Sequence, residues 1–369
     1  MHIPKYKKEK KINMKKAIIF GVTGQTGSYL AKLLIQKNYY VYGIRRRTST
    51  FPLDTYRLEE LIKPDLLKKR LFLKYGDITD EIATRSLIEE IMPDEVYNLA
   101  AQSHVKISFY LPKYTTEANV LGTLNILEAI RSLKLKKKIK MYQASTSEMF
   151  GNSGFKKVIN ENTKMDPVSP YAAGKLFSYH LVKIYRTAYK LHLSNGILFN
   201  HESPHRSEQF VTRKVTLGIL RIHEDIIKEF SLGNINSIRD WGHAEDYALA
   251  IYKMLQLKNP EDLVICTGHH YSVRDFIKHC FKFLKIKIRF IGKNLNEKVV
   301  DNNGKVWIRI NKKYFRPLDV NFLKGSYSRA KKMLNWNPKH NLKSLIRDMM
   351  LYDLNKARLE KVLKKEKNK

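Results

Sequence analysis

The chain has 369 residues, and its 69 Lys and Arg against 35 Asp and Glu give a net charge of +34. It contains no run of 18 apolar residues, which excludes a transmembrane helix. Its two cysteines, Cys266 and Cys280, are too few for a disulfide framework. They fit buried roles in a reducing compartment, so we expect a cytoplasmic protein that is not bound to a membrane.

The basic charge allows two interpretations. It could be the footprint of a nucleic-acid partner, but the basic residues are spread along the chain rather than gathered in one motif. Only the two ends, 1–14 and 356–369, are enriched in them. This even distribution indicates a role in solubility and in attracting an acidic small substrate rather than in binding nucleic acid. Residues 1–14 lack an apolar segment, so we expect a disordered basic arm rather than a secretory signal. Residues 356–369 form a lysine-rich tail.

A glycine-rich loop follows the first predicted strand. Residues 16–20 form a short apolar run that is typical of a buried strand, and Leu30, Leu33 and Leu34 then recur at helical spacing. Glycines between a strand and a helix let the backbone approach a pyrophosphate, whose charge the helix N-terminus favours. This context predicts a dinucleotide site rather than a merely tight turn, with the loop residues Gly21, Val22, Thr23, Gly24, Gln25, Thr26 and Gly27.

The end of the second predicted strand, residues 39–44, indicates which dinucleotide is bound. A dinucleotide site usually has an acid there for the ribose 2′-hydroxyl. This chain instead has Arg45, Arg46, Arg47, Thr48 and Ser49. Arginines suit a 2′-phosphate, so we expect NADP rather than NAD. The alternative is a solvated run of charges.

Further strands and helices alternate along the chain. Strands are expected at 71–75, 95–99, 140–144, 194–199 and 263–266, and helices at 81–91, 116–133, 171–189 and 342–363. The pattern predicts an α/β fold, a Rossmann-like doubly wound parallel sheet with a smaller C-terminal α/β substrate-binding domain. Residues 15–203 would form the NADP-binding domain, with 240–270 returning to it, and residues 204–239 and 271–355 would form the substrate-binding domain.

Tyr171 and Lys175 lie four residues apart at the start of one predicted helix, so their side chains share one face. A nearby ammonium favours phenolate, so we expect Lys175 to lower the pKa of Tyr171 and make it a proton acceptor. This spacing often occurs by chance. The functional interpretation depends on the polar residues Thr146 and Glu148, which follow the fifth predicted strand.

A nucleotide-binding sheet with Ser or Thr and then Tyr-x-x-x-Lys resembles the short-chain dehydrogenase/reductase superfamily, in particular its extended branch that acts on nucleotide sugars. Within that branch the chain resembles the GDP-mannose 4,6-dehydratase family, from about residue 15 to about residue 353. The segments that carry the resemblance are GVTGQTGSYL (21–30), LAAQSHVKIS (99–108), YQASTSE (142–148), NGILFNHESP (195–204), RDWGH (239–243) and FRPLDV (315–320). NHESP and RDWGH are far more specific than the glycine loop.

The resemblance implies conversion of GDP-α-D-mannose to GDP-4-dehydro-6-deoxy-α-D-mannose and water, the first step toward GDP-fucose or related GDP-deoxyhexoses. Carbon 4 is oxidised, water is eliminated across carbons 5 and 6, and hydride returns to carbon 6, so NADP is recycled. Tyr171 with Lys175 would be the base for the 4-hydroxyl, and Thr146 would orient the 4-oxygen. Glu148 would take the carbon-5 proton and help the 6-hydroxyl leave. A simple reductase or epimerase has no need of that carboxylate.

The resemblance also implies the binding residues. Besides the loop from Gly21 to Thr26, the cofactor would contact Arg46, Arg47, Thr48, Ser49, Asp77, Ile78, Leu99, Ala100, Ala101, Gln102, Ser103, Tyr114, Lys175, His201 and Arg206. GDP-mannose would contact Asn200, Lys214, Arg239, Arg316 and Asp319, a set whose cations suit a diphosphate. No metal site is expected. The family forms dimers or tetramers in which the loop 45–54 reaches a neighbouring subunit, so a homo-oligomer is expected.

Four residues depart from the family pattern: Thr26 stands for Asp, His205 for Arg, Ser207 for Gly and Asp319 for Glu. None removes a chemical role, but they could alter cofactor affinity or assembly. Three alternatives stay open. The chain could be another nucleotide-sugar 4,6-dehydratase or an epimerase, a nucleic-acid-binding protein on the same fold, or a scaffold that binds NADP without turnover.

Overall fold

The computed structural model describes residues 14–47, 55–153 and 157–367. The expected basic arm, apart from Met14, lies outside these described residues, as do Thr48 and Ser49. Within the described ranges, no helix combines the length and the apolar character that crossing a membrane requires.

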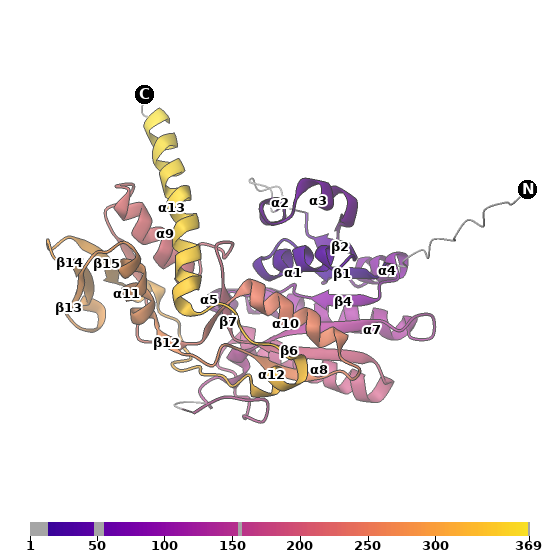
Figure 1. The fold of residues 1–369 in the computed structure, drawn as a ribbon. Coiled ribbons are helices and arrows are strands. Elements are labelled where there is room, and N and C mark those ends of the chain that lie inside the picture. Colours follow the sequence, from indigo (N-terminus) through magenta and orange to yellow (C-terminus); the bar gives the residue numbers. More distant parts are fainter. Residues whose placement is uncertain (1–13, 48–54, 154–156, 368–369) are drawn as a thin grey trace, which may run out of the picture.

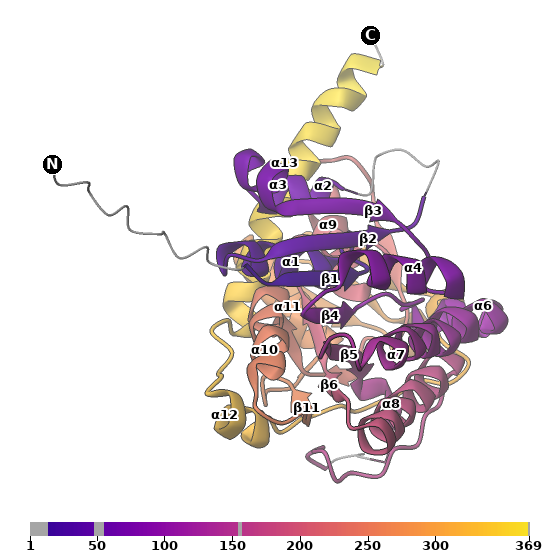
Figure 2. The same ribbon diagram turned by 90° about the vertical axis from the view of Figure 1, so that its right-hand side faces the viewer.

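A seven-stranded parallel sheet forms the centre of the fold (Figures 1 and 2), in the order β11-β6-β5-β4-β1-β2-β3. β1 lies between β2 and β4, so the strand order reverses there and leaves a crevice at the carboxyl ends of the strands. The Rossmann-like doubly wound sheet is therefore confirmed. Its strands are β1 (Lys16–Phe20), β2 (Tyr40–Arg45), β3 (Leu71–Tyr75), β4 (Glu95–Asn98), β5 (Lys140–Thr146), β6 (His192–Leu198) and β11 (Asp262–Ile265).

Helices cover both faces of this sheet, which explains why all four residues of the central strand β4 are buried. Ile19 packs into the core under one layer, and its neighbour Ile18 packs into the core under the other, because successive side chains alternate between faces. Burial of each of these side chains contributes about 1.5–3 kcal/mol to the stability of the fold. One layer contains α1 (Gln25–Gln36), α10 (Ala244–Gln256) and α12 (Ser328–Leu334), and the other contains α4 (Glu81–Ile91), α7 (Gly122–Leu133) and α8 (Pro170–Tyr189).

A smaller α/β unit follows the central sheet. Its four-stranded sheet has the order β13-β14-β15-β8. Trp307 of this sheet packs in one core with Ile219, Phe281 and Met349 from the helices. The unit contains β8 (Phe230–Leu232), β13 (Ile288–Ile291), β14 (Lys298–Asp301), β15 (Val306–Ile310), α9 (Val211–His223), α11 (Val273–Phe283) and α13 (Leu342–Lys367), whose C-terminal end projects from the body in Figure 1.

Two short strand pairs join the units. β7 (Asn200–Glu202) pairs with β10 (Trp241–His243) in parallel, which places Asn200 opposite Trp241. β9 (Ile238–Arg239) pairs with β12 (Tyr271–Ser272). The segments 200–204 and 239–243, which are the most specific sequence motifs, therefore lie side by side.

Several elements differ from their predicted bounds, among them the following three. The fifth strand continues to Thr146, which pairs with Leu198 of β6. The helix expected at 116–133 includes a π-helical turn, where the amide of Asn119 bonds both the N–H and the carbonyl of Gln102. α13 runs four residues beyond its predicted end at Leu363.

The remaining elements are α2 (Tyr56–Leu61), α3 (Pro64–Arg70), α5 (Val105–Tyr110), α6 (Pro112–Thr116), the π-helix η1 (Glu117–Leu121) and the 3₁₀ helices η2 (Ser147–Phe150), η3 (Asn294–Asn296) and η4 (Lys312–Tyr314).

Candidate active site

A cavity of about 840 Å³ lies at the carboxyl ends of β1, β4, β5 and β6 and extends to the smaller unit. The loops after these strands line one side, and residues of α9, β9 and η4 line the other. Ligands of open α/β sheets bind at this edge.

The glycine-rich loop forms one end of the cavity, and its backbone requires glycine. Gly21 has φ of +82°, and a Cβ there would lie 2.9 Å from the backbone nitrogen of Ala100. A Cβ at Gly27 would lie 2.3 Å from the carbonyl oxygen of Gly21. α1 follows Gly24 with no side-chain cap and no acid in its first turn. Its first backbone N–H groups therefore remain available for an anionic ligand.

Thr26 connects this loop to β7, which follows β6 at the same edge of the central sheet. Its Oγ1 lies 2.7 Å from Nε2 of His201, and Nδ1 of His201 lies 3.0 Å from the carbonyl oxygen of Phe199. A carbonyl only accepts, so Nδ1 carries the ring proton and Nε2 accepts from Thr26. Burial lowers the pKa of His201 to about 4, which keeps this contact neutral. The Thr in place of the family's Asp thus still fixes the loop.

Arginines follow β2, as the sequence predicts. The guanidinium of Arg46 bonds the hydroxyl of Tyr114 and lies 5.9 Å from the centre of its ring. Arg45 donates to the hydroxyl of Tyr75 at 3.0 Å. Arg46 and Arg47 are exposed, and neither they nor Tyr114 line the cavity. The structure thus places Tyr114, which only the resemblance indicated, beside Arg46.

Some of the expected cofactor residues instead fix the backbone around the cavity. Oδ1 of Asp77 accepts from the backbone and the hydroxyl of Thr79, which closes the turn after β3. Ile78 is buried against Gly122, and the backbone of Gln102 is held by Asn119. None of Asp77, Ile78 and Gln102 lines the cavity.

The four expected catalytic residues meet on one wall of the cavity. Thr146 ends β5, and its Oγ1 accepts from the backbone N–H of Glu148 at 3.2 Å in the following 3₁₀ turn. Tyr171 and Lys175 lie in the first turns of α8, where Ser169 caps the helix and Pro170 occupies its first position. The hydroxyl of Thr146 hydrogen-bonds the phenol of Tyr171. All four side chains are buried.

The expected lowering of the Tyr171 pKa by Lys175 is wrong. Burial raises the pKa of Tyr171 to about 12, more than the Thr146 hydrogen bond and the charge of Arg206 lower it. Burial also lowers the pKa of Lys175 to about 8, and its Nζ donates to the carbonyl oxygen of Ala144 at 2.9 Å. Both groups lose hydration in the fold, and this desolvation outweighs their proximity along the helix.

Two arginines and a carboxylate form the next part of the wall. Oδ1 of Asp319 lies 3.3 Å from Nη2 of Arg239 and 3.1 Å from Nη1 of Arg316. The same Nη1 of Arg316 lies 3.8 Å from Oε1 of Glu148. Asp319, although shorter than the family's Glu, therefore holds both cations beside the expected catalytic carboxylate.

The remaining expected substrate residues also line the cavity. Nζ of Lys214 lies 3.4 Å from the centre of the Tyr314 ring, and burial lowers the pKa of Lys214 to about 8. Oδ1 of Asn200 is buried and has no hydrogen-bond partner among the described residues. Arg206 pairs through Nε with Oε2 of Glu202 at 3.0 Å. The free oxygen of Asn200 is available to a ligand that donates a hydrogen bond.

The cavity thus gathers most, but not all, of the predicted residues. Those that line it are Gly21, Gly24, Gln25, Thr26, Gly27, Leu99, Ala101, Ser103, Thr146, Glu148, Tyr171, Lys175, Asn200, His201, Arg206, Lys214, Arg239, Arg316 and Asp319. Those described elsewhere are Val22, Thr23, Arg46, Arg47, Asp77, Ile78, Ala100, Gln102 and Tyr114. Lining residues that sequence reasoning missed include Lys106, Glu208, Phe210, Arg221, Trp241 and Tyr314. Lys106 and Trp241 lie in segments that carry the family resemblance, whereas the other four lie outside those segments.

A model of the family described as GDP-mannose 4,6 dehydratase matches residues 18–349. The chain belongs to this family. A GDP-mannose 4,6 dehydratase of Drosophila melanogaster is 48% identical over 347 residues, which cover 92% of this chain and 86% of that protein. The GDP-mannose 4,6-dehydratase of Vibrio cholerae serotype O1 is 44% identical over 368 residues, 96% of this chain and 97% of that one.

Solved structures support the fold. The dTDP-glucose 4,6-dehydratase of Bacillus anthracis, solved in complex with NAD, aligns with a TM-score of 0.73 at 18% identity. The alignment covers 92% of this chain and 96% of that chain. At this identity the likeness bears on the fold alone. The fold of this GDP-mannose 4,6-dehydratase family member is thus shared with a second nucleotide-sugar dehydratase.

Proposed function

We propose that this chain is a GDP-mannose 4,6-dehydratase, which converts GDP-α-D-mannose to GDP-4-dehydro-6-deoxy-α-D-mannose and water with NADP as its recycled cofactor. The carrying observation is the cavity wall on which Thr146, Glu148, Tyr171 and Lys175 meet in a chain of this family. The similarity of the relatives over almost the whole chain supports the same substrate.

The residues around the glycine loop fit a dinucleotide. The uncapped start of α1 would bind its pyrophosphate, and the exposed Arg46 and Arg47 would bind the 2′-phosphate. When bound, NADP would accept a hydride from carbon 4, return it to carbon 6, and bring a positive charge that favours the Tyr171 phenolate.

In the first half-reaction, the hydroxyl of Thr146 would hold the 4-oxygen of mannose and Tyr171 would accept its proton. The buried phenol is protonated at neutral pH, since its pKa lies near 12, so it needs added positive charge to act as a base. Lys175 supports this site: its Nζ is fixed by Ala144, and it would bind the ribose of the cofactor.

In the second half-reaction, the 4-ketone acidifies the proton on carbon 5, so a carboxylate suffices as the base. Glu148 would take that proton and pass a proton to the leaving 6-hydroxyl. Arg239 and Arg316, held by Asp319, would bind the diphosphate and keep the hexose against Glu148. Lys214 would add a further positive charge, and Asn200 and Arg206 would complete the contacts of substrate and cofactor.

The protein is proposed to act in the cytoplasm as a homo-oligomer, a dimer or tetramer. The two buried, free cysteines are compatible with a reducing compartment. Its product would serve the synthesis of GDP-fucose or a related GDP-deoxyhexose.

Incubation of the full-length protein with NADP and single sugar nucleotides tests the proposal. GDP-mannose should lose the mass of one water, while UDP-glucose and dTDP-glucose should remain unchanged. An isomer of unchanged mass would instead favour an epimerase, and turnover of dTDP-glucose would favour another dehydratase. No turnover of any sugar nucleotide, with steeply salt-dependent RNA binding, would favour the nucleic-acid alternative.

A further inference from the structure

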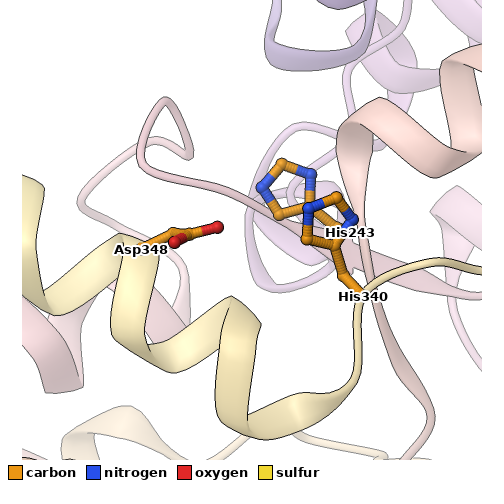
Figure 3. A group of neighbouring side chains, drawn as sticks. All are labelled: His243, His340 and Asp348. Atoms are coloured by element: carbon orange, nitrogen blue, oxygen red, sulfur yellow. The ribbon is translucent and has the colours of Figure 1, made fainter.

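A second group of polar side chains lies where α13 passes the junction of β10 and α10 (Figure 3). His243 ends β10, His340 lies just before α13, and Asp348 lies in the second turn of α13. One ligand atom from each residue lies within 4.8 Å of the other two. None of the three lines the cavity described above, and the proposed dehydratase reaction has no use for them.

Asp348 and His340 each present an uncommitted ligand atom. Among the described residues, the carboxylate of Asp348 forms no hydrogen bond or ion pair, and in Figure 3 it points toward the two rings. Nδ1 of His340 lies 3.0 Å from Oδ2 of Asp246, so the ring proton sits there and Nε2 keeps its lone pair. Oδ2 of Asp246 also accepts from the backbone N–H groups of Lys339 and His340, both at 2.9 Å. Histidines that bind metals are usually oriented by a carboxylate in this way.

His243 can supply the third ligand at a cost. The backbone N–H of Glu245 donates to Nδ1 of His243 at 3.1 Å, so the neutral ring carries its proton on Nε2. Binding through Nε2 moves that proton to Nδ1 and breaks this hydrogen bond. The loss reduces the affinity by about tenfold, so the site should bind more weakly than a four-ligand structural zinc site.

We propose that His243, His340 and Asp348 form a binding site for a divalent transition-metal cation, with zinc as the representative ion. Two imidazoles and a carboxylate are ligands that zinc prefers, and water would complete the coordination. The rings of His243 and His340 are stacked with their centres 4.2 Å apart, so one ring must turn out of the stack before the in-plane lone pairs of both can point at one ion. Ligand atoms around tetrahedral zinc lie about 3.3 Å apart, so the group must close by up to about 1.5 Å. Rotation of the partly exposed Asp348 and His340 side chains can provide this movement.

The ion would connect two segments that are distant in the sequence and so hold the start of α13 against the junction of β10 and α10. α13 also carries Asp353, whose Oδ1 lies 2.6 Å from Nε of the buried Arg213. Arg213 in turn donates to the backbone oxygen of Arg206 in the cavity wall at 3.0 Å. We therefore expect the ion to raise stability, with little change in turnover because it touches no reacting group.

Zinc titration of chelator-treated, full-length protein tests the site. Calorimetry should find one zinc ion bound per chain, and zinc at about 100 times its Kd should raise the Tm by on the order of 3 °C. His243→Asn keeps a side chain that can cap α10, and Asp348→Asn is nearly isosteric. Each should weaken zinc binding at least tenfold. His270→Asn, an exposed histidine outside the group, is the control and should bind zinc as the wild type does.

Absence of saturable zinc binding by the wild type would overturn the proposal, as would wild-type affinity in both variants. Loss of binding in His270→Asn would place the ion at the exposed His269 and His270 and overturn it equally. Asp348→Asn keeps the test decisive if His243→Asn proves unstable.

Discussion

Lys175→Met should abolish turnover yet make the folded chain more stable at pH 7. Burial lowers the pKa of Lys175 from its ordinary 10.5 to about 8. A pKa unit corresponds to about 1.4 kcal/mol, so keeping this charge in the fold costs about 3 kcal/mol at pH 7. Methionine removes that cost but leaves the carbonyl of Ala144 without its donor, which costs about 1–3 kcal/mol. The net gain in the free energy of unfolding should be on the order of 1 kcal/mol.

The pH dependence of this effect is the sharper test. The unfolded chain keeps the Lys175 proton up to about pH 10.5, and the folded chain keeps it only up to about pH 8. Between these values the unfolded state binds more protons, so wild-type stability rises with pH. The variant lacks this rise. From pH 8 to pH 10.5 the free energy of unfolding of the wild type should therefore rise by about 3 kcal/mol relative to that of the variant, so that the wild type becomes the more stable protein.

Urea unfolding of both proteins from pH 7 to pH 10.5 measures this difference, in which other titrating groups cancel. Lys183→Met, at an exposed position of the same helix, is the matched control for the loss of one lysine. A difference between wild type and Lys175→Met that stays constant with pH would refute the reasoning.

Two further variants test the binding contacts. Thr26→Val removes the donor to His201 at almost constant side-chain volume. NADP affinity should therefore fall about fivefold, while turnover at saturating NADP changes little. Thr26→Ser keeps the hydroxyl and should restore the wild-type NADP affinity. Equal NADP affinity in all three proteins, measured by fluorescence titration, would contradict this role. Arg239→Lys keeps the charge but loses the planar fork that meets Asp319, so the KM for GDP-mannose should rise about tenfold and kcat should fall less. Steady-state kinetics would count against the assignment if kcat alone fell.

Local sequence signals were sufficient for the central sheet. β1, β3 and α4 have the predicted bounds because each is a compact apolar or periodic run closed by glycine, aspartate or proline. The glycine loop was recognisable for the same reason, since its neighbours along the chain supply its context. The strands of the small sheet could not be predicted from the sequence. β8 has three residues and β13 and β14 have four each, which is too few to show an alternation of apolar and polar side chains.

What the sequence could not supply is burial. Tyr171 and Lys175 looked like a coupled acid and base along the helix, but the surrounding fold desolvates both, so the pKa of the phenol is raised where a lowering was expected and the pKa of the ammonium is lowered. The contact between Tyr314 and Lys214 likewise arises only in the folded smaller unit, because the two residues are distant in the sequence.

The most direct test of the central claim is the product of Glu148→Gln with NADP and GDP-mannose, followed by mass spectrometry beside the wild type. The glutamine keeps the shape of the side chain but cannot take the carbon-5 proton. The account predicts a 4-keto sugar nucleotide that has lost two hydrogens and kept its 6-hydroxyl, with loss of water slowed by at least a hundredfold. Loss of water at the wild-type rate would contradict the assignment of Glu148 to the elimination.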